Sequence, residues 1–263
     1  MAGKLQETAA ILANRQVAQG IWCMSVQAAG IAQAALPGQF VHVRAANDPV
    51  QFLRMPFAVY DADPAAGLLD ICYQVVGLGT RQLSELEPGQ QLDLIGPIGN
   101  GWQVPSDTRH ALLVGGGVGT PALNLLARQL LLGGVTCDIA VGALTKGKLC
   151  CLEGFRASLE RGSGSLAIAT DDGSTGVAGF VTAVTDGLIA SGAYDYVAVC
   201  GPLPMMRNAV RPALERGICC QVSMEKLMAC GVGACLSCVV ETTQGRRRCC
   251  VDGPVFGAAE VVW

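Results

Sequence analysis

Apolar and polar positions alternate over the first hundred residues. Residues 39–44 (QFVHVR) and 69–76 (LDICYQVV) place β-branched or aromatic side chains at alternate positions, which is typical of half-buried strands. Pro37-Gly38 and Pro88-Gly89 form turn signals that each lead into a strand. Many short strands without long helices predict a small antiparallel β-barrel over residues 1–104.

The pattern changes after Trp102. Compact apolar segments at 111–114, 138–142, 165–170 and 194–200 alternate with helical segments, one of them expected over 121–132. Alternation of strands and helices predicts a parallel, doubly wound α/β domain over residues 105–222. From about Met224 a segment rich in Gly and Cys follows. The predicted fold is therefore α+β and multidomain, with a small third segment at 223–263.

Composition excludes several classes of function. Of the 263 residues 51% are hydrophobic and 15% charged, with a net charge of −3, so no electrostatic argument favours nucleic acid or an anionic membrane surface. The sequence contains no uncharged apolar stretch of about 18 residues, so we expect no membrane span. Residues 1–16 carry charges where a signal peptide needs an apolar run, which favours the cytoplasm. With only His42 and His110 present, neither in a catalytic pattern, we expect no catalytic acid or base.

The thirteen cysteines are informative because disulfides are rare in a reducing compartment. Cys230, Cys235 and Cys238 follow the spacing C-x4-C-x2-C, and Cys250 comes after a hairpin-like stretch. This is the plant-type ferredoxin order for a [2Fe–2S] cluster. Gly231 and Gly233 between the cysteines permit the left-handed backbone and the close wrapping that such a loop needs.

Two other interpretations of these cysteines are open. Buried structural thiols are one, and a zinc site is the other, although zinc usually takes paired C-x2-C knuckles. Cys249 beside Cys250 leaves the fourth ligand open between them. The other eight cysteines are expected to be small core hydrophobes.

Glycine-rich loops predict a nucleotide site. Gly115-Gly-Gly-Val-Gly119 lies between a strand and a helix, where a phosphate can approach the backbone at the positive end of the helix. A simple glycine turn is the alternative interpretation, because the motif is not G-x-G-x-x-G. Cys200-Gly201-Pro202 and Asp171 follow two further strands, at the carboxyl edge where open α/β sheets bind ligands.

The barrel half offers a second set of candidates. Arg54 could pair with a pyrophosphate, and the loop around Gly77–Thr80 could supply backbone N–H groups. A solvated surface charge and an ordinary turn are the competing interpretations.

In these segments the chain resembles the electron-transfer subunit of the two-subunit, NAD-linked dihydroorotate dehydrogenases, within the ferredoxin-reductase superfamily. The resemblance covers nearly the whole chain and is most specific over Glu225–Cys238. It implies FAD in the barrel, NAD(H) on the α/β domain and a [2Fe–2S] cluster held by Cys230, Cys235, Cys238 and Cys250. It also implies a separate FMN-containing catalytic subunit in a heterotetramer. The family's Arg-Arg-Pro-x-Ser is changed here, since Met55 replaces the second Arg and Ala58 the Ser.

The residues expected to bind the cofactors follow from these motifs and from the resemblance. They are Arg54, Met55, Pro56, Phe57, Ala58, Cys72, Tyr73, Gln74, Gly79, Thr80, Gly115, Gly116, Gly117, Gly119, Asp171, Cys200, Gly201 and Pro202.

The resulting hypothesis is an oxidoreductase subunit that moves electrons between NAD(H) and a dihydroorotate dehydrogenase in pyrimidine biosynthesis. Nicotinamide exchanges two electrons as hydride and a [2Fe–2S] cluster exchanges one, so a flavin belongs between them. One alternative is a reductase subunit of the same scaffold that serves a bifurcating transhydrogenase, a sulfide dehydrogenase or a hydrogenase. A non-catalytic redox sensor is the other. Lys146 and Lys148 follow the second strand of the α/β domain without an acidic residue assignable to a ribose, which leaves NAD and NADP both open.

Overall fold

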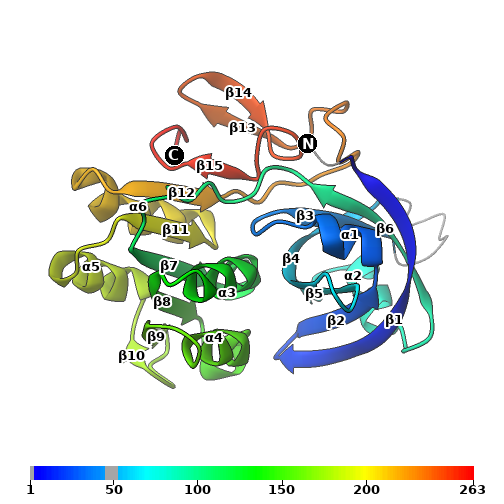
Figure 1. Ribbon diagram of the computed structural model, residues 1–263, viewed down its shortest axis with the longest axis horizontal. Coiled ribbons are helices and arrows are strands. Elements are labelled where there is room, and N and C mark those ends of the chain that lie inside the picture. Colours follow the sequence, from blue (N-terminus) through cyan, green and yellow to red (C-terminus); the bar gives the residue numbers. More distant parts are fainter. Residues whose placement is uncertain (1–2, 45–52) are drawn as a thin grey trace.

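The computed structural model describes residues 3–44 and 53–263. Figure 1 shows a barrel on one side, a sheet with helices on both faces on the other, and the C-terminal segment lying above the two. Among the described residues, no helix has the length and apolar character needed to cross a membrane.

The N-terminal half is a closed antiparallel barrel of six strands in the order β1-β2-β5-β4-β3-β6, as the alternating pattern predicts. Inward-facing side chains such as Met24, Val41 and Leu94 are fully buried in its core. Two short helices, which the pattern does not reveal, are α1 (Ala29–Ala34) and α2 (Leu78–Ser84). The strands are β1 (Leu5–Ala18), β2 (Ile21–Gln27), β3 (Phe40–Arg44), β4 (Met55–Asp63), β5 (Leu68–Gln74) and β6 (Gln91–Ile98).

The second half is a seven-stranded sheet in the order β10-β9-β8-β7-β11-β12-β15. All neighbours pair in parallel except β15, which pairs antiparallel with β12. The reversal of strand order beside β7 is the switch point expected of a doubly wound sheet. The strands are β7 (His110–Gly116), β8 (Thr136–Ala143), β9 (Gly164–Thr170), β10 (Val177–Ala178), β11 (Tyr196–Cys200), β12 (Cys219–Ser223) and β15 (Val255–Gly257).

The helices of this half include one that departs from the sequence pattern. The helix expected over 121–132 begins instead with a 3-10 turn, η1 (Gly117–Leu123), and becomes α-helical only at α3 (Asn124–Leu132). Pro121 lies inside the 3-10 segment, where it has no N–H to donate. The remaining helices are η2 (Lys146–Lys148), α4 (Leu152–Leu159), α5 (Val181–Ser191) and α6 (Leu203–Glu215).

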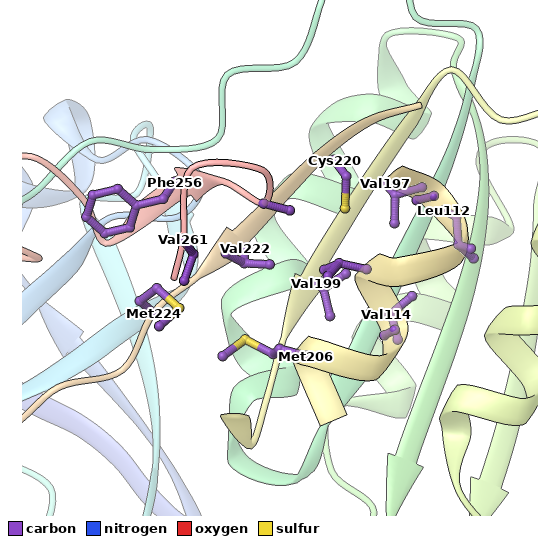
Figure 2. Close-up of a cluster of buried hydrophobic side chains, with 14 of the residues drawn as sticks. Leu112, Val114, Val197, Val199, Met206, Cys220, Val222, Met224, Phe256 and Val261 are labelled. Carbon is purple, nitrogen blue, oxygen red and sulfur yellow. The ribbon is translucent and has the colours of Figure 1, made fainter. Parts of the chain in front are cut away.

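One buried hydrophobic cluster joins the sheet to the C-terminal segment. Figure 2 shows Val199 and Val222 of the sheet and Met206 of α6 in the same layer as Phe256 and Val261. Burial of apolar surface stabilises the folded protein by roughly 25 cal/mol per Å². The C-terminal segment therefore packs as part of the same core and is not a loosely attached appendage.

The linker between barrel and sheet is held by close backbone contacts. A Cβ on Gly101 would lie 2.3 Å from the carbonyl oxygen of Pro37, and the N–H of Trp102 donates to the same oxygen at 2.9 Å. Asn100 reaches the C-terminal segment, since its N–H donates to the carbonyl of Gly253 at 2.6 Å. Residues 100–102 thus hold the barrel and the C-terminal segment together at one place.

Candidate functional site

The carboxyl ends of the parallel strands meet the barrel at a cavity of about 770 Å³. Gly115 and Gly116 end β7 and Gly117–Gly119 begin η1, Asp171 follows β9, and Gly201 and Pro202 follow β11. Gln74, at the end of β5, closes the cavity from the barrel side. Of the residues expected to bind cofactors, those that line it are Gln74, Gly116, Gly117, Gly119, Asp171, Gly201 and Pro202.

Glycine is needed in this cavity because two loops nearly touch. A Cβ on Gly119 would lie 2.6 Å from the backbone nitrogen of Gly201, and one on Gly116 would lie 2.2 Å from Sδ of Met205. Gly117 takes φ +53° and has open space beside it. The loop therefore exposes backbone to the cavity at the start of η1, which is the arrangement that a phosphate requires.

Several residues lining the cavity were missed by the sequence analysis. Phe180 and Val181 begin α5, Met205 lies on α6, and Glu225 follows β12. Their signal was available in principle, because each follows a strand or begins a helix at the carboxyl edge of the sheet. Their residue types form no motif, however, and Phe180 is 69% exposed.

The remaining barrel candidates lie around the first residues of β4. Pro56, Phe57 and Ala58 pair with β3, and Arg54, just before β4, is ion-paired with Asp93 of β6. Burial raises the pKa of Asp93, but hydrogen bonds from Arg54 and Gln6 outweigh it and lower that pKa. The guanidinium of Arg54 is therefore already held in place by a carboxylate, with 15% of its side chain exposed.

Two of the predicted side chains point away from the cavity. Tyr73 is fully buried in the barrel core, where its ring packs 5.5 Å from that of Phe57 and its hydroxyl donates to Asn14 Oδ1 at 2.9 Å. Thr80 Oγ1 accepts the N–H groups of Val76 and Gly77 and so closes the loop before α2. Both side chains organise the barrel, and only their backbones are left for a cofactor.

Cys72 belongs to a second group of thiols between the barrel and the α/β domain. Its Sγ lies 4.0 Å from that of Cys151, and Cys23 faces it directly across β2 and β5. Cys150 Sγ contacts the carbonyl of Gly117 at 3.6 Å. Hydrogen bonds with Cys151 and Cys23, together with burial, raise the pKa of Cys72 well above its usual range.

The cysteine-rich loop precedes a hairpin of β13 (Val239–Thr242) and β14 (Gly245–Arg248), as the sequence predicts. In the part of the chain that the structure describes, no three His, Cys, Asp or Glu side chains surround one point as the ligands of a single ion do. The thiols lie near one another in two pairs, Cys230 with Cys235 and Cys238 with Cys250, and Cys250 also lies near Cys230. Two pairs match a group that holds two irons, each needing two thiolates.

Backbone donors point at the first pair. The N–H groups of Val232 and Cys235 donate to Cys230 Sγ at 3.4 and 3.5 Å. Burial raises the pKa of Cys230, but these two donors outweigh it and lower that pKa. Hydrogen bonds with Ser237 lower the pKa of Cys235 to about 6. The loop therefore favours thiolates, which are the ligands that iron requires.

Tight packing holds this loop against the rest of the molecule. Gly231 (φ +65°) and Gly233 (φ +88°) are left-handed, and a Cβ on them would lie 2.7 Å from the His42 ring and 2.5 Å from Val251 respectively. Arg248 donates to the carbonyl of Gly233 at 3.3 Å and pairs with Asp252 at 3.1 Å. The small residues and donors in this loop fit a [2Fe–2S] cluster.

The second pair distinguishes Cys250 from Cys249. Burial raises the pKa of both thiols, to about 11 for Cys250 and about 12 for Cys249. Both thiols lie near Cys238, and Cys250 also lies near Cys230 and the backbone of Gly233. Cys249 uses its backbone N–H to bond the carbonyl of Cys238 at 2.9 Å. Of the two, Cys250 is therefore the one whose surroundings include Cys230 as well as Cys238.

Comparison with solved structures defines the class of protein. The chain superposes on NADH-dependent reduced ferredoxin–NADP oxidoreductase, solved in a study of flavin-based electron bifurcation, with a TM-score of 0.87 and 32% identity, covering 100% of this chain and 92% of that one. A ferredoxin reductase of carbazole 1,9a-dioxygenase shares the fold at a TM-score of 0.68 and 22% identity, covering 82% and 67%. The fold is therefore that of the ferredoxin-reductase class.

Sequence relatives then define the family. Residues 225–262 match the iron–sulfur cluster binding domain of dihydroorotate dehydrogenase B. The electron transfer subunit of dihydroorotate dehydrogenase B (NAD(+)) from Geobacillus kaustophilus is 37% identical over 98% of both chains. That from Fusobacterium nucleatum is 35% identical over 94% of this chain and 95% of its own. The chain belongs to the family of dihydroorotate dehydrogenase B electron transfer subunits.

Proposed function

We propose that this chain is the electron transfer subunit of an NAD-dependent dihydroorotate dehydrogenase and acts with an FMN-containing catalytic subunit. The observation that carries the proposal is the pairing of thiols in the Cys230–Cys250 region within a chain that resembles these subunits over 98% of its length. FAD, a [2Fe–2S] cluster and NAD(H) are the expected cofactors, and together they convert between hydride and single-electron transfer.

The protein's own contribution is to bind and orient these groups. Gly116, Gly117 and Gly119 offer backbone to a nucleotide phosphate, and Gly201 and Pro202 close the opposite wall of the same cavity. The backbone of β4 from Met55 to Ala58, with Arg54, Gly79 and Thr80, would hold the flavin. Cys230, Cys235, Cys238 and Cys250 would hold the cluster. No general acid or base is needed on this chain, since neither hydride nor electron transfer removes a proton from carbon.

The organisation that goes with this proposal has three parts. The FAD-binding barrel spans residues 1–104, the NAD-binding domain 105–222 and the cluster-binding segment 223–263, in accord with a barrel that ends at Ile98 and a sheet that begins at His110. A cytoplasmic location is part of the proposal, supported by thirteen cysteines that are all free thiols.

The first test is the composition of the purified protein. It should contain FAD and no FMN, with about two irons and two acid-labile sulfides per chain. Alone it should oxidise NADH with ferricyanide and leave dihydroorotate untouched. Zinc without iron or labile sulfide would contradict the cluster assignment.

The second test is reconstitution with the catalytic subunit. The pair should oxidise dihydroorotate with NAD⁺, and Cys250→Ser should abolish that coupling while sparing NADH–ferricyanide turnover. Cys249→Ser is the matched control, because Cys249 is the neighbouring buried thiol and its hydrogen bond to Cys238 is made by the backbone N–H, which the substitution keeps. Coupling at an unchanged rate in a Cys250→Ser protein without iron would refute the relay.

A second candidate function follows from the similarity to the bifurcating oxidoreductase at 32% identity. A reductase subunit for such a partner would share every element of the site described above. Co-purification with identification of the partner by mass spectrometry separates the two, since a dihydroorotate-oxidising partner supports the first and a ferredoxin-linked one the second.

A further inference from the structure

One of the two histidines is buried without a partner. His42 is 1% exposed, and neither Nδ1 nor Nε2 has a hydrogen-bond partner among the described residues. His110, by contrast, lies with Nε2 at 2.9 Å from Asp138 Oδ2. An imidazole carries at least one N–H in either protonation state, and buried donors are nearly always paired. None of the described residues is therefore the hydrogen-bond partner of His42.

The direction of the ring follows from the strand alternation in β3. Val41 and Val43 point into the barrel core, so Phe40 and His42 point outward. On that outer face Phe40 packs in one buried cluster with Cys238 and Cys250. The ring of His42 lies against Gly231, where a Cβ would come within 2.7 Å of Nδ1.

The same residue also lies beside the strand expected to hold the flavin. His42 is the register partner of Pro56 in β4 and of Ile95 in β6. Burial, with the nearby charges of Arg54 and Lys4, lowers the pKa of His42 to about 4. The ring is therefore neutral at pH 7, with one N–H to donate.

A [2Fe–2S] cluster would bring the missing acceptor, because its sulfides and thiolates accept hydrogen bonds. We propose that His42 is a positioning residue that donates its ring N–H to a sulfur of the cluster bound through Cys230. This inference rests on the proposed function. A donor to sulfur stabilises the reduced cluster, which carries the extra negative charge, and so raises its reduction potential.

The test compares three variants of the full chain. His42→Phe removes the donor and keeps a ring, His42→Gln keeps an N–H donor, and His110→Phe is the control for loss of the other histidine. The midpoint potential and the EPR spectrum of the reduced cluster are measured after iron and labile sulfide have been quantified.

In His42→Phe the one-electron equilibrium should shift about tenfold toward the oxidised cluster, which is about 59 mV for one electron, with altered g-values. His42→Gln should recover most of the shift, and His110→Phe should match the unaltered protein. A fully loaded His42→Phe with the same potential and g-values would overturn the proposal.

A measurement on the unaltered chain covers the case in which His42→Phe does not hold its cluster. With ¹⁵N-labelled histidine, pulsed EPR of the reduced cluster should detect a histidine nitrogen that persists in His110→Phe. Absence of any such coupling would overturn the proposal. Absence of iron and sulfide from the unaltered protein would instead contradict the proposed function, so the two failures are distinguishable.

Discussion

Replacement of Gly119 by alanine is the most direct probe of the nucleotide site. The added Cβ would lie 2.6 Å from the nitrogen of Gly201, 2.7 Å from its Cα and 2.8 Å from the carbonyl carbon of Cys200. All three atoms are backbone, so no side chain can rotate away. The turn after β11 and the loop after β7 must therefore move apart.

The magnitude follows from that geometry. A Cβ is essentially never found closer than 3.0 Å to another heavy atom, so the two turns must separate by about 0.4 Å, the difference between 3.0 and 2.6 Å. Overpacking of this kind costs about 1–3 kcal/mol. The strained contact joins two walls of the cavity, so we expect about 1.4–2.8 kcal/mol of this cost to appear as weaker nucleotide binding. That loss corresponds to about a 10- to 100-fold rise in the KM for NADH.

Two further glycines provide the comparison. Gly187→Ala places its Cβ in open space within α5 and should raise the free energy of unfolding by up to about 1 kcal/mol, because alanine is the better helix former. Gly117→Ala also meets no atom, but φ +53° makes alanine about 1–2 kcal/mol less favourable there.

Urea unfolding and the NADH dependence of ferricyanide reduction measure all three variants. Gly119→Ala should show the largest rise in KM with FAD retained. If its KM and unfolding midpoint match those of the Gly187→Ala protein, the close contact does not shape the nucleotide site and the reasoning fails.

The remaining predictions concern the cluster and the sheet. Cys250→Ser should lose most of its iron and its reduced-cluster EPR signal, whereas Cys249→Ser should keep both; the reverse result would mean that the fourth ligand is misassigned. Burial raises the pKa of Asp138, but hydrogen bonds from Ser165, Tyr194 and His110 outweigh burial and lower that pKa overall. Its contribution to stability is thus present above the unfolded-state value of about 3.9 and is lost as pH falls through the lower folded-state value. Asp138→Asn should reduce the free energy of unfolding by about 1–3 kcal/mol at pH 7 and by less near pH 3. An equal loss at both pH values in urea titrations would contradict this account.

Strand and helix order could be predicted because each element carries a strong local signal. The barrel strand alternates apolar and polar residues from Val41 to Arg44, and the buried parallel strands at 111–114 and 196–200 are continuous apolar runs. The short helices α1 and α2 escaped because six or seven residues are too few for a helical period to emerge. The 3-10 start of the helix after β7 depends on packing against β4 and β11, which no local pattern encodes.

The candidate site divides in the same way. Loops with glycine, such as Gly115–Gly119, could be found because the chemistry needs that residue type. Tyr73 shows the limit, because its side-chain direction is set by the pairing of β5 in a closed barrel, which places the ring in the core. His42 shows the same limit, because its place beside the cysteine-rich loop depends on a contact with Gly231, nearly two hundred residues later in the chain.

The antiparallel pairing of β15 with β12 limits how this chain can be divided. Residues Gln221–Ser223 bond to Val255–Gly257, so the sheet ends on a strand that belongs to the cluster-bearing segment. A chain shortened to end near residue 223 would leave the backbone donors and acceptors of β12 open to another chain, and such open edges promote aggregation. The C-terminal segment therefore cannot be exchanged independently of the sheet. Chimeras between relatives should take β12 and β15 from the same parent.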